Sequence, residues 1–314
     1  MTDTGAAPPS LDRDARRERD SEPAADSVAP LAATPFQRPD LAAAEGQRLS
    51  FVERALIRFV RRTLEPGPVD RAIRVCQRVI GSTWIHHFTK HLRFVYGRER
   101  LPALGLDQSF ILVSNHRSFF DLYVVMGDLV RNGLLHRIVF PVRAKFFYTS
   151  PLGLFVNGVM SFFAMYPPIF RERRQAALNV KSLDELVWLL RRGGVFTGIH
   201  PEGTRKKDDD PYTFLPAQRG VGKIIHEARV PVIPVFINGL INDLPRQIRS
   251  NFDGTGRRIV VVFGEPIEFG ALLDERSSPR VHQAIADRTL EAIAELGLEE
   301  KRHRAELEAR DASR

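Results

Sequence analysis

Apolar residues recur at helical spacing in two consecutive segments near the start of the chain, at about residues 49–64 and 69–92. In the first segment the apolar positions are Leu49, Val52, Leu56, Phe59 and Val60, and the arginines on another face are Arg54, Arg58, Arg61 and Arg62. Pro66-Gly67-Pro68 ends this helix. The second segment again mixes arginines with aliphatic and aromatic residues. Such a basic amphipathic pair is typical of a membrane-interface element, but a helical hairpin packed on the core with a solvated basic rim fits the periodicity equally well.

From Phe94 onward, short apolar runs alternate with helical stretches. The expected strands are Phe94–Tyr96, Phe110–Ser114, Arg137–Val142, Phe162–Met165, Val195–Ile199, Val232–Ile237 and Ile259–Phe263. The expected helices between them are Leu122–Arg131, Ala176–Arg192 and Gln218–Ala228, and a charged helix follows at Pro279–Ala312. This alternation predicts an α/β fold whose mixed, largely parallel sheet is flanked by helices.

The segment Phe146–Phe170 has no charged residue across 25 positions, which is long enough for a helix to span a bilayer. Prolines, glycines and an asparagine interrupt it, and Lys145 and Arg171 bracket it. We therefore expect a broken helix followed by a buried strand, and entry of this segment into the bilayer is the alternative.

Composition and charge divide the 314 residues further. Residues 1–48 hold six Arg against nine Asp/Glu and no apolar signal core, so we expect a disordered tail. Residues 49–100 hold eleven Lys/Arg against four Asp/Glu, a basic patch suited to an anionic membrane or nucleic acid. The expected organisation is tail 1–48, helical pair 49–93, α/β domain 94–270 and helical extension 271–314. The single Cys76 excludes an internal disulfide framework.

The clearest local signal for chemistry is the sequence from Ser114 to Asp121, which follows an expected strand and opens an expected helix. His116 lies in the turn and Asp121 in the first helical turn, so an imidazole and the carboxylate that orients it can pair there. No serine or cysteine stands in a Gly-x-Ser-x-Gly elbow, so the pair would activate a substrate hydroxyl directly. By itself the pattern more often describes a loop histidine with a helix-capping aspartate.

Two further signals follow strands. In His200-Pro201-Glu202-Gly203-Thr204-Arg205, a carboxylate and a guanidinium three residues apart suit an anionic headgroup, or simply an ion pair that closes a surface turn. Val230-Pro231-Val232-Ile233-Pro234-Val235 would line an apolar wall or belong to the core.

These three motifs in this order resemble those of the glycerolipid phosphate acyltransferase family, and the resemblance covers roughly residues 90–270. It implies acyl transfer from acyl-CoA or acyl carrier protein, as co-substrate without a cofactor, to the free hydroxyl of 1-acylglycerol-3-phosphate in phospholipid biosynthesis. His116 would be the general base and Asp121 its partner. The groups that it implies for acceptor and phosphate binding are Glu202, Gly203, Thr204, Arg205, Arg171 and Lys145. Pro234 would serve acyl-donor binding or structure.

The chain departs from the family pattern at two places. His200 stands where an aromatic residue is usual, and we expect a neutral structural substitution there, with contact between His200 and the site as the alternative. In the family, a short strand normally ends in an arginine that binds phosphate, but here Tyr166-Pro167-Pro168-Ile169-Phe170 intervenes before Arg171. This departure bears on the identity of the acceptor more than on the type of reaction. Glycerol-3-phosphate, another lysophospholipid, or lipid binding without catalysis are the alternatives.

The partners that we expect are a lipid acceptor, the acyl donor and an anionic membrane surface. Nucleic acid is not expected, because the aromatic spacing fits no RNA-binding motif. No metal site is expected either, since His86-His87 and Asp208-Asp209-Asp210 lack supporting ligands. The protein would lie at the cytoplasmic face of the membrane, as a peripheral or monotopic enzyme.

Overall fold

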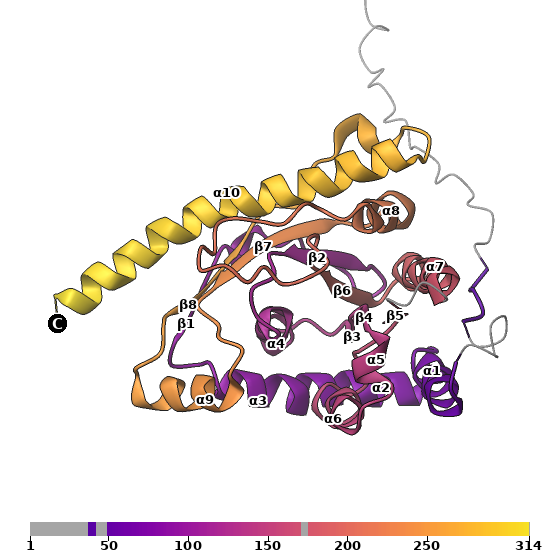
Figure 1. Ribbon diagram of the computed structural model, residues 1–314, viewed down its shortest axis with the longest axis horizontal. Helices are drawn as coiled ribbons and strands as arrows, with labels where there is room; N and C mark the ends of the chain where they lie inside the picture. The colour runs from indigo at the N-terminus through magenta and orange to yellow at the C-terminus, as the bar shows by residue number, and fades with distance from the viewer. Residues whose placement is uncertain (1–36, 42–48, 171–174, 314) are drawn as a thin grey trace, which may run out of the picture. The chain divides into compact units, whose positions relative to one another are not determined.

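A six-stranded sheet is central to the computed structural model, which describes residues 37–41, 49–170 and 175–313 (Figure 1). Its strands are β1 (Arg93–Tyr96), β2 (Phe110–Ser114), β3 (Arg137–Val139), β6 (Val195–Ile199), β7 (Val232–Asn238) and β8 (Ile259–Phe263). They lie in the order β1-β8-β7-β2-β6-β3, and only the β7–β8 pairing is antiparallel. The expected mixed, largely parallel sheet is confirmed. The residues of β2, β6, β7 and β8 are all buried, as expected of strands covered on both faces.

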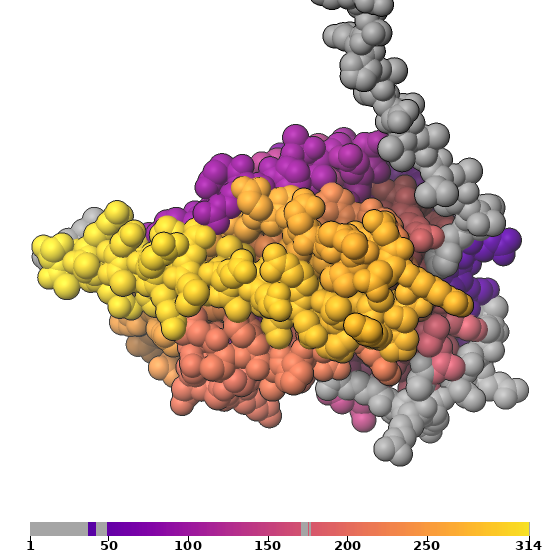
Figure 2. All heavy atoms as spheres, turned by 90° about the horizontal axis from the view of Figure 1, so that it is seen from above, coloured from indigo at the N-terminus to yellow at the C-terminus, as the bar shows by residue number. Residues whose placement is uncertain are grey.

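Helices cover the sheet on both sides. Helices α8 (Arg219–Ala228) and α10 (Pro279–Ala312) lie on one side, and α7 (Ala176–Arg192) packs against α8, whereas α4 (Asp121–Arg131) lies on the other side and packs against the N-terminal helices. Helix α10 packs on α8 and along β7 and β8, and Figure 2 shows it lying across that side of the protein. The C-terminal helix is therefore part of the same compact unit as the sheet, which comprises residues 37–314.

The predicted N-terminal helical pair is present, and its second member contains a π-helical turn. Helix α1 spans Phe51–Thr63, and α2 (Pro68–Cys76), the π-helix Gln77–Gly81 and α3 (Ser82–His87) form one run. Ser50 and Glu53 form a capping box that fixes the start of α1. Ile57, Val60 and Leu64 are buried, so this layer packs on the rest of the unit.

The uncharged segment 146–170 folds as short pieces. The pieces are the end of α5 (Ala144–Phe147), then α6 (Pro151–Phe155), a π-helical turn (Val156–Met160) and the two-residue strand β5 (Pro168–Ile169). Strand β5 pairs with β4 (Val142–Arg143). Across the residues described, no helix is both long and apolar enough to cross a bilayer.

Three expectations about individual elements were wrong. The expected strand Phe162–Met165 is irregular, because Phe162 and Phe163 turn with positive φ at the end of the π-helix. Pro141, which lacks an N–H group, divides the expected strand Arg137–Val142 into β3 and β4. A further helix, α9 (Leu244–Asp253), begins at the capping residue Asp243 and was not expected.

Most of the expected disordered tail lies outside the described residues. Residues 37–41, however, are placed against the unit: Leu41 is buried, and the Arg38 guanidinium donates to the buried carboxylate of Glu185 at 2.6 and 2.8 Å. The tail expectation is therefore wrong for these five residues, because a buried carboxylate needs a cationic partner.

Candidate active site

The sheet brings the first two sequence motifs together. Strands β2 and β6 are parallel neighbours, with Val113 opposite Ile199. Parallel strands end at the same edge of a sheet, so the loops that follow them, which carry His116 and Glu202, meet there. The N–H of Lys206 donates to the carbonyl of His116 at 3.2 Å, which joins the two loops directly.

His116 and Asp121 form the predicted pair. The His116 Nδ1 lies 3.4 Å from Asp121 Oδ2, and the same oxygen accepts the backbone N–H groups of Arg117 at 2.8 Å and Ser118 at 2.7 Å. The Asp121 side chain is 1% exposed, whereas that of His116 is 20% exposed. Burial raises the pKa of Asp121 to about 6, and the neighbouring His200 and the two N–H groups oppose that rise.

Glu202 ties the loop that carries His116 in place. Its Oε1 accepts the backbone N–H of His116 at 2.9 Å and its Oε2 accepts that of Leu215 at 2.8 Å. The residue is buried, and burial raises its pKa. Both oxygens therefore bind backbone groups, and acceptor binding by Glu202 stays a prediction.

Asn115 anchors the other side of the same loop. Its side-chain amide donates to the carbonyl of Ile237 at 2.8 Å and accepts the N–H of Ile237 at 2.9 Å. Because the side chain is buried and bonded to β7 at both ends, the turn that carries His116 is fixed to the centre of the sheet.

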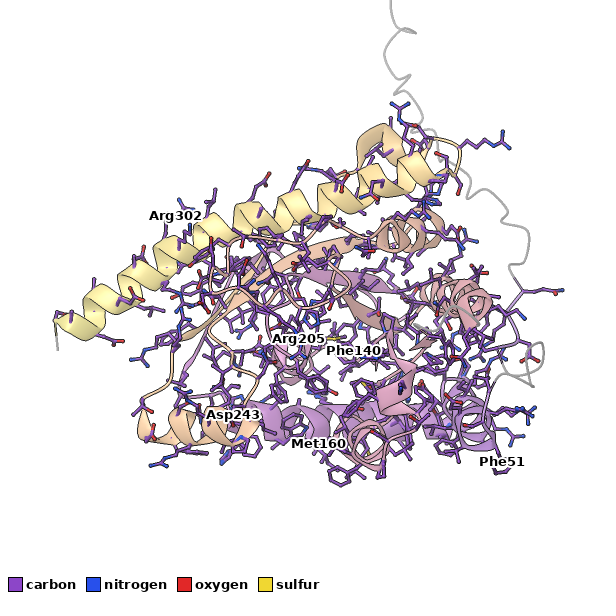
Figure 3. The ribbon with its side chains drawn as sticks, viewed as in Figure 1. Phe51, Phe140, Met160, Arg205, Asp243 and Arg302 are labelled. Atoms are coloured by element: carbon purple, nitrogen blue, oxygen red, sulfur yellow. The ribbon has the colours of Figure 1, made fainter. Side chains whose placement is uncertain are left out.

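Arg205 lies at the open side of the site and is labelled in Figure 3. Its guanidinium donates to Asn242 Oδ1 at 2.6 Å, and that oxygen also accepts the N–H of Phe119 at 2.9 Å. The Asn242 amide in turn donates to the carbonyl of Arg117 at 3.3 Å. Sequence reasoning missed Asn242, which connects the second motif to the first through the loop after β7.

His200 also belongs to this site. Its ring is stacked on that of His116, with centroids 3.7 Å apart and planes within 8°. The ring contacts the proposed base, so the alternative, that His200 touches the site, describes its position. The sequence contained a signal for this contact: at position 200 an imidazole replaces the usual aromatic ring, and both kinds of ring can stack.

The remaining predicted residues are placed around this centre. Gly203 and Thr204 are exposed, and Gly203 has φ +65°, where a Cβ would also meet the Gln218 side chain at 2.9 Å. Lys145 is exposed on α5, whose Phe146 and Phe147 rings contact Phe119. Pro234 is buried in β7 opposite Val113, and its carbonyl accepts the N–H of Gly264. Arg171 lies outside the described residues.

Charged side chains cross the rim of the site. Asp208 accepts from Arg117 Nη1 at 2.8 Å and pairs with Lys206 Nζ at 2.7 Å. These two cations lower the pKa of Asp208 to about 2. Asp208 thus fastens the loop after β6 to the His116 turn.

Ligand atoms of His116, Asp121 and His200 lie within 4.8 Å of one another, which raises the question of a metal ion. An imidazole binds a metal through a nitrogen lone pair in the plane of its ring. Two rings stacked face to face direct their lone pairs in separate parallel planes, so one ion cannot lie in both. The stack therefore fits a pair of interacting rings better than a chelate.

Known proteins resemble the chain over this region. Residues 93–238 match the family model described as Acyltransferase. The 1-acyl-sn-glycerol-3-phosphate acyltransferase BAT2 of Brassica napus, chloroplastic, is 27% identical over 180 residues, covering 56% of this chain and 46% of that protein. The 1-acyl-sn-glycerol-3-phosphate acyltransferase of Bacillus subtilis is 25% identical over 173 residues, covering 55% and 72%. The chain thus matches less than half the length of the plant relative.

Among solved structures, the 1-acyl-sn-glycerophosphate acyltransferase PlsC of Thermotoga maritima superposes with a TM-score of 0.46 and 23% identity, covering 76% of this chain and 87% of that one.

Proposed function

The chain belongs to the glycerolipid acyltransferase family through residues 93–238, and on that premise we propose that it transfers a fatty acyl group from a thioester donor to 1-acylglycerol-3-phosphate. The names of the relatives support this acceptor. The observation that carries the proposal is the convergence of the two loops: Glu202 bonds the N–H of His116 at 2.9 Å, while Asp121 lies 3.4 Å from its ring.

The reaction follows from these positions. The free hydroxyl of the acceptor loses its proton to His116 as its oxygen attacks the thioester carbonyl carbon. The resulting tetrahedral intermediate collapses, so that the C–S bond breaks while the new C–O ester bond remains. The thiolate then takes the proton from the His116 imidazolium, which leaves a free thiol and the ester. Asp121 orients the ring and stabilises the imidazolium while it exists.

Arg205 would bind the acceptor phosphate. The guanidinium is exposed beside the His116 turn, and Asn242 holds it by a bond of 2.6 Å. A planar guanidinium pairs well with a phosphate, and a fixed phosphate positions the hydroxyl for attack. Lys145 and Arg171 remain further predictions for the same phosphate.

An apolar cavity supports a site for an acyl chain. It lies between the N-terminal helices, α4 and the π-helical turn, and Gly81, Tyr123, Gly127 and Met160 are among the residues that line it. Tyr123 also stacks on Phe119, which follows His116 by three residues, with ring centroids 5.8 Å apart. The cavity has a volume of about 30 Å³, so an acyl chain could enter it only if neighbouring side chains moved.

The helical layer below the sheet supports binding to an anionic membrane surface. Large apolar side chains are at least half exposed on three of its segments: Phe51, Val52, Phe59, Val69, Val75, Val79, Ile80, Leu152, Phe155 and Val159. Arg58, Arg62, Arg71 and Arg78 are exposed on the same helices. Exposed apolar groups among arginines favour a membrane interface over a solvated rim. The cytoplasmic leaflet, which is anionic, would suit this surface.

An acceptor panel tests the proposal. Free thiol released from acyl-CoA would be measured with 1-acylglycerol-3-phosphate, glycerol-3-phosphate, a lysophosphatidylcholine or no acceptor, and acyl carrier protein would be tested as a second donor. We expect the fastest release with 1-acylglycerol-3-phosphate. Faster release with either other acceptor would contradict the proposed acceptor, and none with any acceptor from either donor would contradict catalysis.

A further inference from the structure

The stack of His200 on His116 has no part in the reaction as written above. Since the two centroids are 3.7 Å apart and the planes nearly parallel, the faces of the rings are in van der Waals contact. We infer that His200 is a positioning residue for the proposed acyl transfer: the face of its ring, rather than its nitrogen atoms, holds the His116 imidazole in the orientation that removes a proton. This inference rests on the proposed function.

The contact of the His116 ring with Asp121 is a weak restraint. At 3.4 Å, the distance from Nδ1 to Asp121 Oδ2 is long for a hydrogen bond. The same oxygen already accepts two shorter bonds from the backbone of Arg117 and Ser118. A long bond at one atom does not by itself fix the tilt of the imidazole, whereas a second ring against its face opposes that tilt.

The position of His200 is itself well fixed. Its Nδ1 lies 3.0 Å from the carbonyl oxygen of Ser114, and because a carbonyl only accepts, Nδ1 carries the hydrogen. Ser114 ends β2 two residues before His116, and His200 directly follows β6. The two rings are therefore held by neighbouring parallel strands, and the stack has the rigidity of the sheet.

The charge of His200 also suits this role. Burial and the neighbouring His116 lower the pKa of His200 to about 3, so its ring is neutral at neutral pH. A neutral aromatic face attracts a cation, whereas a second imidazolium would repel one. The stack thus favours the imidazolium that His116 becomes when it takes the hydroxyl proton.

The test compares two substitutions that remove the same nitrogen atoms. His200→Phe keeps an aromatic face, and His200→Leu has a similar bulk without one, while both lose the bond to Ser114. For 1-acylglycerol-3-phosphate and acyl-CoA, we expect kcat of His200→Phe within about threefold of the wild type. We expect His200→Leu to lose about 10- to 100-fold in kcat, with both KM values within about twofold, because misorientation of a catalytic group lowers turnover rather than binding.

Controls separate this inference from the proposed function. His200→Met supplies a second ring-free side chain should the leucine variant fold poorly, and thermal melting and vesicle binding are compared for each variant. If the wild type is active and His116→Ala is not, the proposed function stands. Equal turnover of the phenylalanine and ring-free variants, whether both high or both low, would then overturn the role of the ring face. An inactive wild type would instead overturn the proposed function.

Discussion

The two members of the proposed catalytic pair differ greatly in exposure. The His116 side chain is 20% exposed, so a substrate can reach it, whereas the Asp121 side chain is 1% exposed. Burial disfavours the ionised carboxylate, which is why its pKa rises from 3.8 to about 6. At neutral pH, Asp121 is therefore a buried charge that orients His116 at a cost in stability.

The first prediction concerns Asp121→Asn. The native pKa of Asp121 lies above the unfolded value, so its contribution to stability is fully present below pH 3.8 and is lost as pH rises through about 6. Asparagine does not titrate, so its stability relative to the wild type should increase by up to about 3 kcal/mol between pH 4 and pH 7.5. Turnover should fall at least about 100-fold, because an amide does not stabilise the imidazolium.

Urea unfolding of both proteins at several pH values, beside thiol release, measures this trade-off. A variant whose relative stability decreased with rising pH, or one with normal turnover, would contradict the account.

At this scale, the sequence indicated the groups but not all their contacts. The predicted His116, Asp121, Glu202 and Arg205 lie around one site, because two parallel strands carry them to the same edge of the sheet. Asn242 could not be foreseen, since it reaches Arg205 from a loop 37 residues away whose path depends on tertiary structure. His200 could have been weighed differently, because its position next to Glu202 already placed it beside the site.

At the scale of elements, the N-terminal helices have two apolar faces. Ile57, Val60 and Leu64 are buried, whereas Phe51 and Val79 are 84% and 58% exposed. Figure 3 shows Phe51 on the side of the protein away from Arg302 of α10. The buried face packs the N-terminal helices against the rest of the protein, so deleting these helices would disturb folding. Single substitutions on the exposed face are therefore the better test of membrane binding.

The second prediction concerns the double variant Phe51→Ser, Val79→Ser. Burying a large apolar side chain contributes roughly 1.5–3 kcal/mol, so even partial insertion of two such groups implies a loss of at least about tenfold in partitioning onto anionic vesicles. Because both residues are exposed, the free energy of unfolding should change little. Co-sedimentation with vesicles measures the partitioning.

Leu298→Ser provides the matched control, since Leu298 is 65% exposed on α10 instead. It should bind vesicles like the wild type. Equal binding by the double variant and the wild type, or an equal loss in the Leu298 variant, would exclude the helical layer as the docking face.

Helices and strands with a strong apolar pattern were predictable from the sequence. Elements whose ends depend on prolines, capping residues or turns were less so. Strands β2, β6 and β8 have the predicted bounds, because short, mainly apolar runs of five residues suit buried strands. Asp243 followed by Leu244 and Pro245 is a helix-start signal that would have predicted α9. The turn at Phe162 and Phe163 could not be foreseen, because two adjacent bulky residues with positive φ depend on the packing around them.

At the scale of the whole described unit, the order of the strands creates the site. The fold class followed from the alternation of strands and helices, but the order β1-β8-β7-β2-β6-β3 and the reversal at β8 did not. That order places β2 between β6 and β7, so Glu202 after β6 and Ile237 on β7 both hold the turn that carries His116. Pairing partners far apart in sequence are set by tertiary packing rather than by local pattern.

The most direct measurement of the central claim is thiol release from acyl-CoA by His116→Ala in the presence of 1-acylglycerol-3-phosphate. General base catalysis contributes about 10²- to 10⁴-fold, so we predict a loss of that size in kcat. Melting temperature and vesicle binding should match the wild type, because the His116 side chain is partly exposed and does not belong to the helices that carry the apolar face. Near-normal turnover by this variant would contradict the account.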